Sequence, residues 1–104
     1  MAPAESLPKI LAAEYDPDIL KMVEMALKSI GAQVLLAEDG EQALEIFLVE
    51  KPQLLILDVM MPGLSGWEVA KYIRDREEYA DVRLLMLTGI GESLNATTSR
   101  MMGA

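Results

Sequence analysis

Short runs of apolar residues alternate along this chain with segments in which apolar residues recur every three or four positions. Four such runs occur, at residues 9–13, 33–37, 54–57 and 82–87. Runs of this length with at most one polar residue are typical of strands that are buried on both faces of a parallel sheet. The alternation therefore predicts an α/β fold in which right-handed crossovers place helices on both faces of one parallel sheet.

The first and third predicted helices have clear start signals. Asp16 precedes Pro17, which combines an N-cap acid with proline at the first helical position. Gly31 ends this helix as a C-cap. Ser65 and Glu68 form the pattern Ser-x-x-Glu, which predicts a capping box at the start of the third helix.

The second helix is predicted to begin at Asp39, with Gln42 placed as in a capping box. An Asp-Gly pair often marks a hairpin, but the helical spacing that follows argues against one here. Pro52 stops the helix. A fourth helix, over residues 94–102, is expected to be weak because Asn, Thr and Ser are poor helix formers.

One carboxylate, Asp58, ends the most apolar of the predicted strands, and a Pro-Gly turn follows it. In open α/β sheets, ligands bind and chemistry occurs at the carboxyl ends of the strands. A carboxylate buried there without a partner would be costly, so its presence needs a reason. We expect Asp58 to be a nucleophile that forms an aspartyl phosphate.

Glu14, Asp16 and Thr88 follow other predicted strands and would reach the same edge of the sheet. Neighbouring carboxylates repel one another unless a cation lies between them. Two or more carboxylates together with backbone carbonyls suit Mg²⁺, which keeps several waters. The Thr88 hydroxyl would bind the oxygens of a phosphoryl group, whereas Asp16 is explained more simply as the cap of the first helix.

Composition narrows the chemistry further. The 104 residues fit one domain, with a flexible segment at residues 1–7 and a folded domain over 8–104. The net charge of −8 argues against nucleic-acid binding by this domain. The chain has no Cys and no His, which excludes thiol and imidazole catalysis and leaves oxygen ligands for any metal. No apolar run is long enough for a membrane span and no signal-peptide core is present, so we expect a cytoplasmic protein.

Residues 56–66, Ile-Leu-Asp-Val-Met-Met-Pro-Gly-Leu-Ser-Gly, resemble the phospho-acceptor signature of response-regulator receiver domains. The start of the first helix, residues 37–44 and residues 86–89 fit the same pattern, so the resemblance spans nearly the whole chain from Lys9. It implies a flavodoxin-like, doubly wound sheet with strand order 2-1-3-4 in the four units present.

The resemblance also implies a function. A histidine kinase or phosphotransfer protein would pass a phosphoryl group to Asp58 within a two-component phosphorelay. Mg²⁺ would be held by Glu14, Asp58 and the backbone carbonyl of Met60, with Asp16 as a further candidate. Thr88 would bond the phosphoryl group and couple it to a change of the partner-binding surface. Such a chain is a signal-transduction module rather than an enzyme.

The chain departs from the family pattern at Tyr15, at Gly89, where a small residue such as Ala is usual, and at its end. Tyr15 stands where receiver domains have a second acid, and a protonated phenol is a poor Mg²⁺ ligand. The sequence stops at Ala104, before the fifth strand, its lysine and the fifth helix of the family. We therefore expect an exposed edge at the fourth strand, which a second copy or a completing chain could cover.

Three functions remain open at this stage. The first is an active receiver, and the second is a degenerate receiver that acts as an interaction or dimerisation module without phosphotransfer. The third is a nucleotide or flavin binder of the same architecture. It is disfavoured because the residues after the first strand, 14–18, are acidic and would repel phosphate.

Overall fold

The computed structural model describes residues 7–87 of the chain. In these residues strands and helices alternate as the sequence predicts. The elements are β1 (Lys9–Ala13), α1 (Pro17–Ser29), β2 (Gln33–Ala37), α2 (Gly40–Glu50), β3 (Leu54–Asp58), α3 (Gly66–Arg74), the 3₁₀ helix η2 (Glu77–Tyr79) and β4 (Arg83–Leu87). The expected fourth helix lies outside the described residues.

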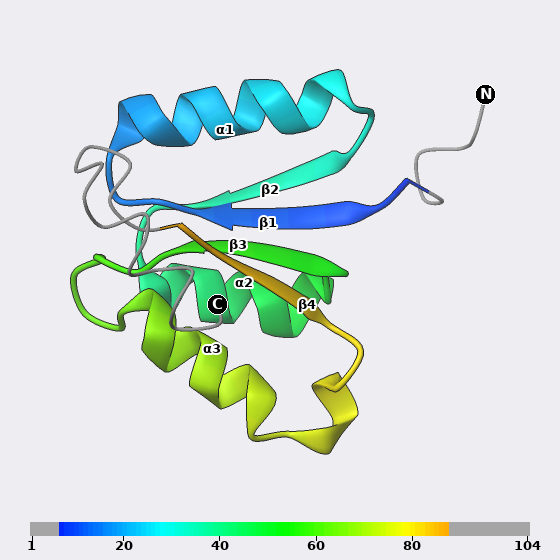
Figure 1. Cartoon of the computed structure of the whole chain (residues 1–104), viewed down its shortest axis with the longest axis vertical. Helices are drawn as coiled ribbons and strands as arrows, with labels where there is room; N and C mark the ends of the chain where they lie inside the picture. The colour runs from blue at the N-terminus through cyan, green and yellow to red at the C-terminus, as the bar shows by residue number, and fades with distance from the viewer. Residues whose placement is uncertain (1–6, 88–104) are drawn as a thin grey trace.

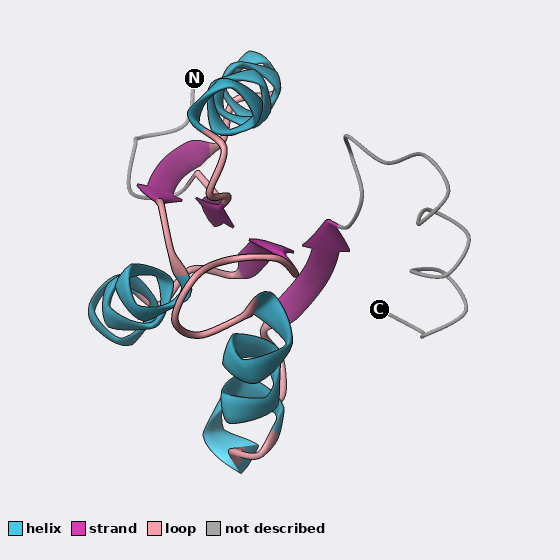
Figure 2. Cartoon of the chain, turned by 90° about the vertical axis from the view of Figure 1, so that its left-hand side faces the viewer, coloured by secondary structure: helices cyan, strands magenta, loops and turns pink. Residues whose placement is uncertain are grey.

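The four strands form one parallel sheet in the order β2-β1-β3-β4. Helix α1 covers one face of this sheet, and α2 and α3 cover the other (Figures 1 and 2). The predicted fold class and strand order are therefore confirmed. Within the described part of the chain, no helix is both long and apolar enough to cross a bilayer.

Side chains alternate between two hydrophobic cores, as the two-residue period of a strand requires. Leu11 and Leu55 pack with Phe47 and Ile73 on the side of α2 and α3. Helix η2, which the sequence pattern did not predict, extends this larger core: the Tyr79 ring meets Phe47 edge-on at 4.8 Å. The smaller core lies under α1, and its buried members are Ile10, Ala12, Leu20, Leu27 and Ile56.

The helix boundaries follow the predicted caps for α1 and α3. The Asp16 side chain accepts hydrogen bonds from the backbone N–H groups of Asp18 and Ile19, at 2.9 and 3.4 Å. Ser65 and Glu68 form the complete capping box at α3, each side chain accepting from the other residue's backbone N–H. Both predictions are confirmed, and both caps lie at the carboxyl edge of the sheet.

The start of α2 differs from the prediction in one detail. Asp39 caps the helix by accepting from the Gln42 N–H at 2.8 Å. The Gln42 side chain, however, accepts from the N–H of Glu38 and not from that of Asp39, so the capping box is not complete. The glutamine side chain is long enough to reach the N–H of Glu38, the residue before the cap. The helix ends at Glu50, and its C-cap Lys51, whose backbone is left-handed (φ 49°), precedes Pro52.

Candidate functional site

The register of β1 and β3 brings two carboxyl groups together. Ala13 pairs with Leu57, so the residues that follow them, Glu14 and Asp58, lie side by side. These two residues are the buried charged side chains of the described chain, with exposed fractions of 5% and 8%. Strand pairing thus places the two carboxyl groups side by side at the carboxyl edge of the sheet, where α/β proteins bind ligands.

This proximity changes the acid–base behaviour of Glu14. Burial raises its pKa to about 7, and a hydrogen bond with the Asp58 carboxyl acts in the same direction. The backbone N–H of Asp16, which donates to Glu14 Oε2 at 3.0 Å, opposes the rise. In the absence of a cation, Glu14 is therefore about half protonated at neutral pH.

The loop after β3 fixes the Asp58 side chain. The Met60 N–H donates to Asp58 Oδ1 at 3.2 Å. The Val59 N–H donates to the Leu87 carbonyl at 3.0 Å and ties the loop to β4. The Val59 carbonyl accepts from Gly66 N–H at 3.2 Å and ties the loop to the start of α3. The Met60 N–H thus holds the carboxylate, and the loop that supplies it is tied to both β4 and α3.

Two glycines allow the surrounding backbone to pack closely. A Cβ on Gly66 would lie 2.9 Å from the Asp58 carbonyl carbon, and a Cβ on Gly40 would lie 2.7 Å from the Leu64 carbonyl carbon. The beginnings of α3 and α2 therefore press directly on the backbone of the acceptor residue and of its loop. Neither glycine is among the site residues that the sequence predicts. A glycine in the first turn of a helix is a signal that could have indicated this close packing, since glycine is unfavourable there without a packing reason.

Tyr15 and Asp16, which the sequence raised as metal-site positions, follow Glu14 directly in the turn between β1 and α1. Asp16 is exposed and caps α1, and its backbone also binds Glu14. The Tyr15 side chain is 62% exposed. It lines a hollow of about 270 Å³ beside the N-terminus of α1, together with Leu20 of α1 and Leu36 of β2. Thr88 lies outside the described residues.

The donor set for a divalent cation is small but chemically suitable. Among residues 7–87, no group of three or more acidic, histidine or cysteine side chains is placed to hold a metal ion. Glu14 and Asp58 supply two carboxylates, and the Met60 carbonyl belongs to the same turn. Mg²⁺ is commonly held by one or two carboxylates and several waters, so this oxygen-only set fits it.

Comparisons with known proteins define the class of protein to which this fold and site belong. Residues 10–104 match the family described as the response regulator receiver domain. The chain belongs to this family.

Among curated proteins, the chain is similar to the probable transcriptional regulator ycf27 of Cyanophora paradoxa, with 40% identity over 92% of this chain and 39% of that protein. It is also similar to the phosphate regulon transcriptional regulatory protein PhoB of Pseudomonas aeruginosa, with 36% identity over 91% of this chain and 42% of that protein. The chain thus spans about two fifths of the length of these relatives.

Solved structures agree with this assignment. A putative response regulator from Chloroflexus aurantiacus superposes with a TM-score of 0.81 at 29% identity, covering 95% of this chain and 81% of that one. The chemotaxis response regulator CheY4 of Vibrio cholerae gives a TM-score of 0.78 at 30% identity, with 95% and 82% covered. The chain therefore has the receiver fold of two-component signalling proteins, which are signalling modules rather than classical enzymes.

Proposed function

We propose that Asp58 accepts a phosphoryl group from a phosphohistidine of a kinase or phosphotransfer protein. The observation that carries this proposal is the buried Glu14–Asp58 pair at the carboxyl edge of the sheet. Two buried carboxyl groups in contact cost stability, and that cost is understandable where they serve a reaction. Membership of the receiver family supports the same role.

The chemistry requires a carboxylate oxygen of Asp58 to approach the phosphorus atom opposite the P–N bond that breaks. A P–O bond to Asp58 forms while the P–N bond to the donor imidazole breaks, and the electron pair of that bond stays on the imidazole nitrogen, which then takes a proton. The Met60 N–H holds the Asp58 carboxylate in place for this attack. Later hydrolysis of the acyl phosphate returns Asp58 and releases inorganic phosphate.

Glu14, Asp58 and the Met60 carbonyl would hold Mg²⁺, with Asp16 as a further candidate ligand. When bound, the cation offsets the charge of the carboxylates and of the phosphoryl oxygens. Glu14 must lose its proton for this role, which a nearby divalent cation favours. We also propose that Thr88 hydrogen-bonds the phosphoryl group and couples it to a surface change.

The donor protein would approach beside α1. Tyr15, Met22 and Met25 are each more than 60% exposed, and all three lie on α1 or in the turn that leads into it from Glu14. Exposed methionines form adaptable apolar contact surfaces. This surface begins at the turn that follows Glu14, so a protein seated there could bring a phosphohistidine close to Asp58.

We propose residues 8–104 as the receiver domain and residues 1–7 as a flexible lead-in. The curated relatives are transcriptional regulators more than twice as long as this chain. In a protein of that kind, the receiver would control transcriptional regulation through a surface that changes when Asp58 is phosphorylated.

A second candidate is a degenerate receiver that acts only as an interaction module. Tyr15 favours it, because an exposed phenol stands where the family has an acid and the described site holds only two buried carboxyl groups. A homodimer or a completing chain at the β4 edge remains part of this alternative. Leu85 on β4 is 48% exposed and would be covered by such a contact.

Intact-mass spectrometry after incubation with acetyl phosphate and Mg²⁺ tests the proposal. A single phosphoryl adduct is expected, and it should disappear in Asp58→Asn. Asp75→Asn is the matched control, because Asp75 is an exposed aspartate at the far end of α3 and its loss should leave the adduct unchanged. Absence of an adduct on folded protein would contradict the active receiver and favour the interaction module.

A further inference from the structure

The outer edge of β2 presents backbone groups that the sheet does not use. The Gln33 N–H donates to the Pro8 carbonyl and the Ala37 carbonyl accepts from the Glu14 N–H, at 2.8 and 3.1 Å. Because backbone groups alternate in direction along a strand, this pairing turns the N–H and C=O groups of Val34 and Leu36 away from β1. These two residues therefore lie in position to pair with a further strand.

Three features that commonly prevent strand addition are absent from this edge. Its sequence, Gln33–Ala37, contains no charged residue and no proline, and its residues pair with β1 one for one without a bulge. The four residues before Ala37 are only partly buried. The edge thus combines free backbone groups with accessible aliphatic side chains.

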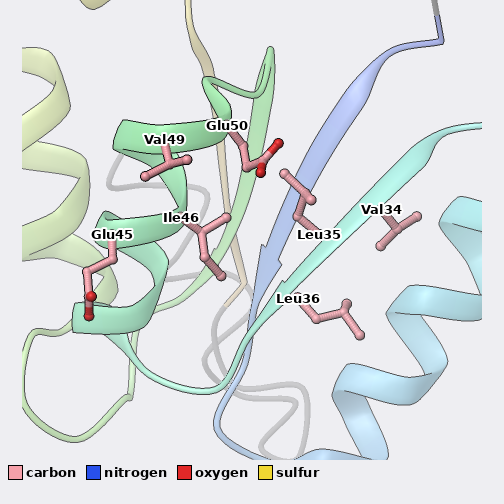
Figure 3. A pocket seen from close by; sticks show the side chains of 7 residues that line it. All are labelled: Val34, Leu35, Leu36, Glu45, Ile46, Val49 and Glu50. Atoms are coloured by element: carbon pink, nitrogen blue, oxygen red, sulfur yellow. The ribbon is translucent and has the colours of Figure 1, made fainter. Parts of the chain in front are cut away.

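An apolar groove of about 570 Å³ runs beside this edge, between β2 and α2 (Figure 3). It is lined by Val34, Leu35, Leu36, Glu45, Ile46, Val49 and Glu50. In Figure 3, Leu35 points from β2 toward α2, whereas Val34 and Leu36 point toward α1. Val49 is 77% exposed at the rim. No residue of the acidic pair or of its loop lines the groove, so this is a separate surface.

The charge of the groove indicates what could occupy it. Glu45 is exposed and Glu50 pairs with Lys9 at 3.1 Å, so the rim is acidic with one carboxylate engaged. The whole chain carries a net charge of −8. A second copy seated here would bring like charges together, whereas a basic segment would be attracted.

We propose that an extended segment of a partner protein adds to β2 as a further strand, with apolar residues and one Lys or Arg at the alternate positions that face α2. Its backbone pairs with Val34 and Leu36, its apolar side chains cover Leu35, Ile46 and Val49, and a basic side chain reaches Glu45. Backbone pairing supplies affinity in this mode of recognition, and the flanking pocket supplies selectivity. The interaction does not depend on phosphotransfer at Asp58.

The test uses two short labelled peptides, in which threonine occupies every second position and the positions between carry the residues that are to face α2. In the valine–lysine peptide these are two valines and a lysine, and in the valine–glutamate peptide glutamate replaces the lysine. With ¹⁵N-labelled protein, the valine–lysine peptide should shift the Val34 and Leu36 amide signals saturably and slow their hydrogen exchange. Fluorescence anisotropy should show that Glu45→Lys and Val49→Lys each weaken its binding about tenfold or more. Glu78→Lys is the matched control, because it makes the same charge change at an exposed site on η2, away from the groove, and should leave affinity within about twofold.

Three results would overturn the proposal. They are the absence of saturable shifts at Val34 and Leu36 at millimolar peptide, equal binding of the valine–glutamate peptide, and equal weakening by Glu78→Lys. Concentration-dependent dimerisation that Val49→Lys abolishes would assign the edge to a second copy and would also overturn it. The Asp58→Asn variant should bind the peptide unchanged, which separates this surface from the proposed phosphotransfer.

Discussion

Gly66 lies against the backbone of Asp58, and the space between them has no room for a side chain. A Cβ at Gly66 would come within 2.9 Å of the Asp58 carbonyl carbon and closer still to its oxygen. The Gly66 N–H also donates to the carbonyl of the next residue, Val59. The start of α3 and the end of β3 therefore form one rigid unit, and the position of the candidate acceptor depends on the position of the helix.

Replacing Gly66 with alanine should destabilise the protein by about 1–3 kcal/mol, because the methyl group can be accommodated only if backbone moves. It should also slow modification of Asp58 by acetyl phosphate. Urea unfolding and intact-mass time courses measure the two effects.

Gly31→Asn is the control for this substitution. Gly31 has a positive φ of 85° that asparagine tolerates, and nothing lies within 4 Å of an added Cβ. This variant should keep its stability within about 0.5 kcal/mol, as is usual for surface substitutions. A Gly66→Ala protein as stable and as reactive as the parent would show that the loop moves freely.

The sequence predicted the positions of the strands and the capped helices well, because the relevant physics is local. Four apolar runs, the Asp16 cap and the Ser65–Glu68 box each depend on residues within a few positions. The topology followed from the alternation of strand and helix together with the handedness of crossovers. The acidic pair was predictable from parallel pairing, once Glu14 and Asp58 were both placed at strand ends.

Other features depend on packing between separate elements, or on a choice between neighbouring groups, and local sequence patterns specify neither. A glycine in the first turn of a helix signals close packing, but nothing near Gly66 or Gly40 indicates which carbonyl group lies against each of them. Helix η2 is stabilised by the packing of Tyr79 on Phe47, thirty-two positions earlier in the printed sequence, rather than by a periodic pattern of its own. Gln42 bonds Glu38 in place of Asp39, a choice between neighbours that spacing alone does not determine.

Glu14 should make the stability of the protein depend on pH in magnesium-free buffer. Its pKa is about 7 in the folded protein and 4.5 in an unperturbed carboxyl. Between these values the unfolded chain has released a proton that the folded protein retains, so stability falls as the pH rises from 4.5 to 7. The contribution is complete below pH 4.5 and lost above pH 7. The Asp58 carboxyl and the backbone of Tyr15 and Asp16 are the groups that face this carboxyl.

Glu14→Gln tests this dependence, since glutamine can donate to Asp58 much as the protonated acid does. We expect the variant to unfold at higher urea than the parent at pH 8 and to differ little from it at pH 4.5. Glu24→Gln is the control, because ion pairing with Lys28 lowers the pKa of Glu24 and its removal should not stabilise the protein at pH 8. Equal stability of parent and Glu14→Gln at pH 8 would argue against a raised pKa.

The capping box at Ser65 should be worth about 1 kcal/mol to the protein. Ser65→Ala removes the acceptor that binds the Glu68 N–H at 3.2 Å and leaves that donor without its cap. Urea unfolding should show the loss, while Glu68→Gln should cost less because its side-chain oxygen still accepts from the Ser65 N–H. If Glu68→Gln proves as damaging as Ser65→Ala, the charge of Glu68 near the helix N-terminus is the larger contribution.

Tyr15→Asp should strengthen Mg²⁺ binding. The substitution adds a third carboxylate beside Glu14 and Asp58, and affinity for hard cations rises with the number of charged oxygen ligands. We expect the Mg²⁺ dissociation constant to fall about tenfold, which corresponds to about 1.4 kcal/mol. Trp67, the single tryptophan of the chain, lies in the first turn of α3, which follows the loop after Asp58. Its fluorescence can follow the titration.

The same variant separates the two proposed functions when it is compared with Tyr15→Phe, which removes the hydroxyl but adds no charge. If Tyr15 limits only the cation, Tyr15→Asp should accelerate phosphorylation of Asp58 by acetyl phosphate and Tyr15→Phe should not. If both variants bind Mg²⁺ no better than the parent, Glu14 and Asp58 already define the cation site, and the phenol has no part in it. If Tyr15→Asp gains Mg²⁺ affinity while Asp58 still acquires no phosphoryl group, weak cation binding is not what limits the chain. That combination would favour the interaction module over the active receiver.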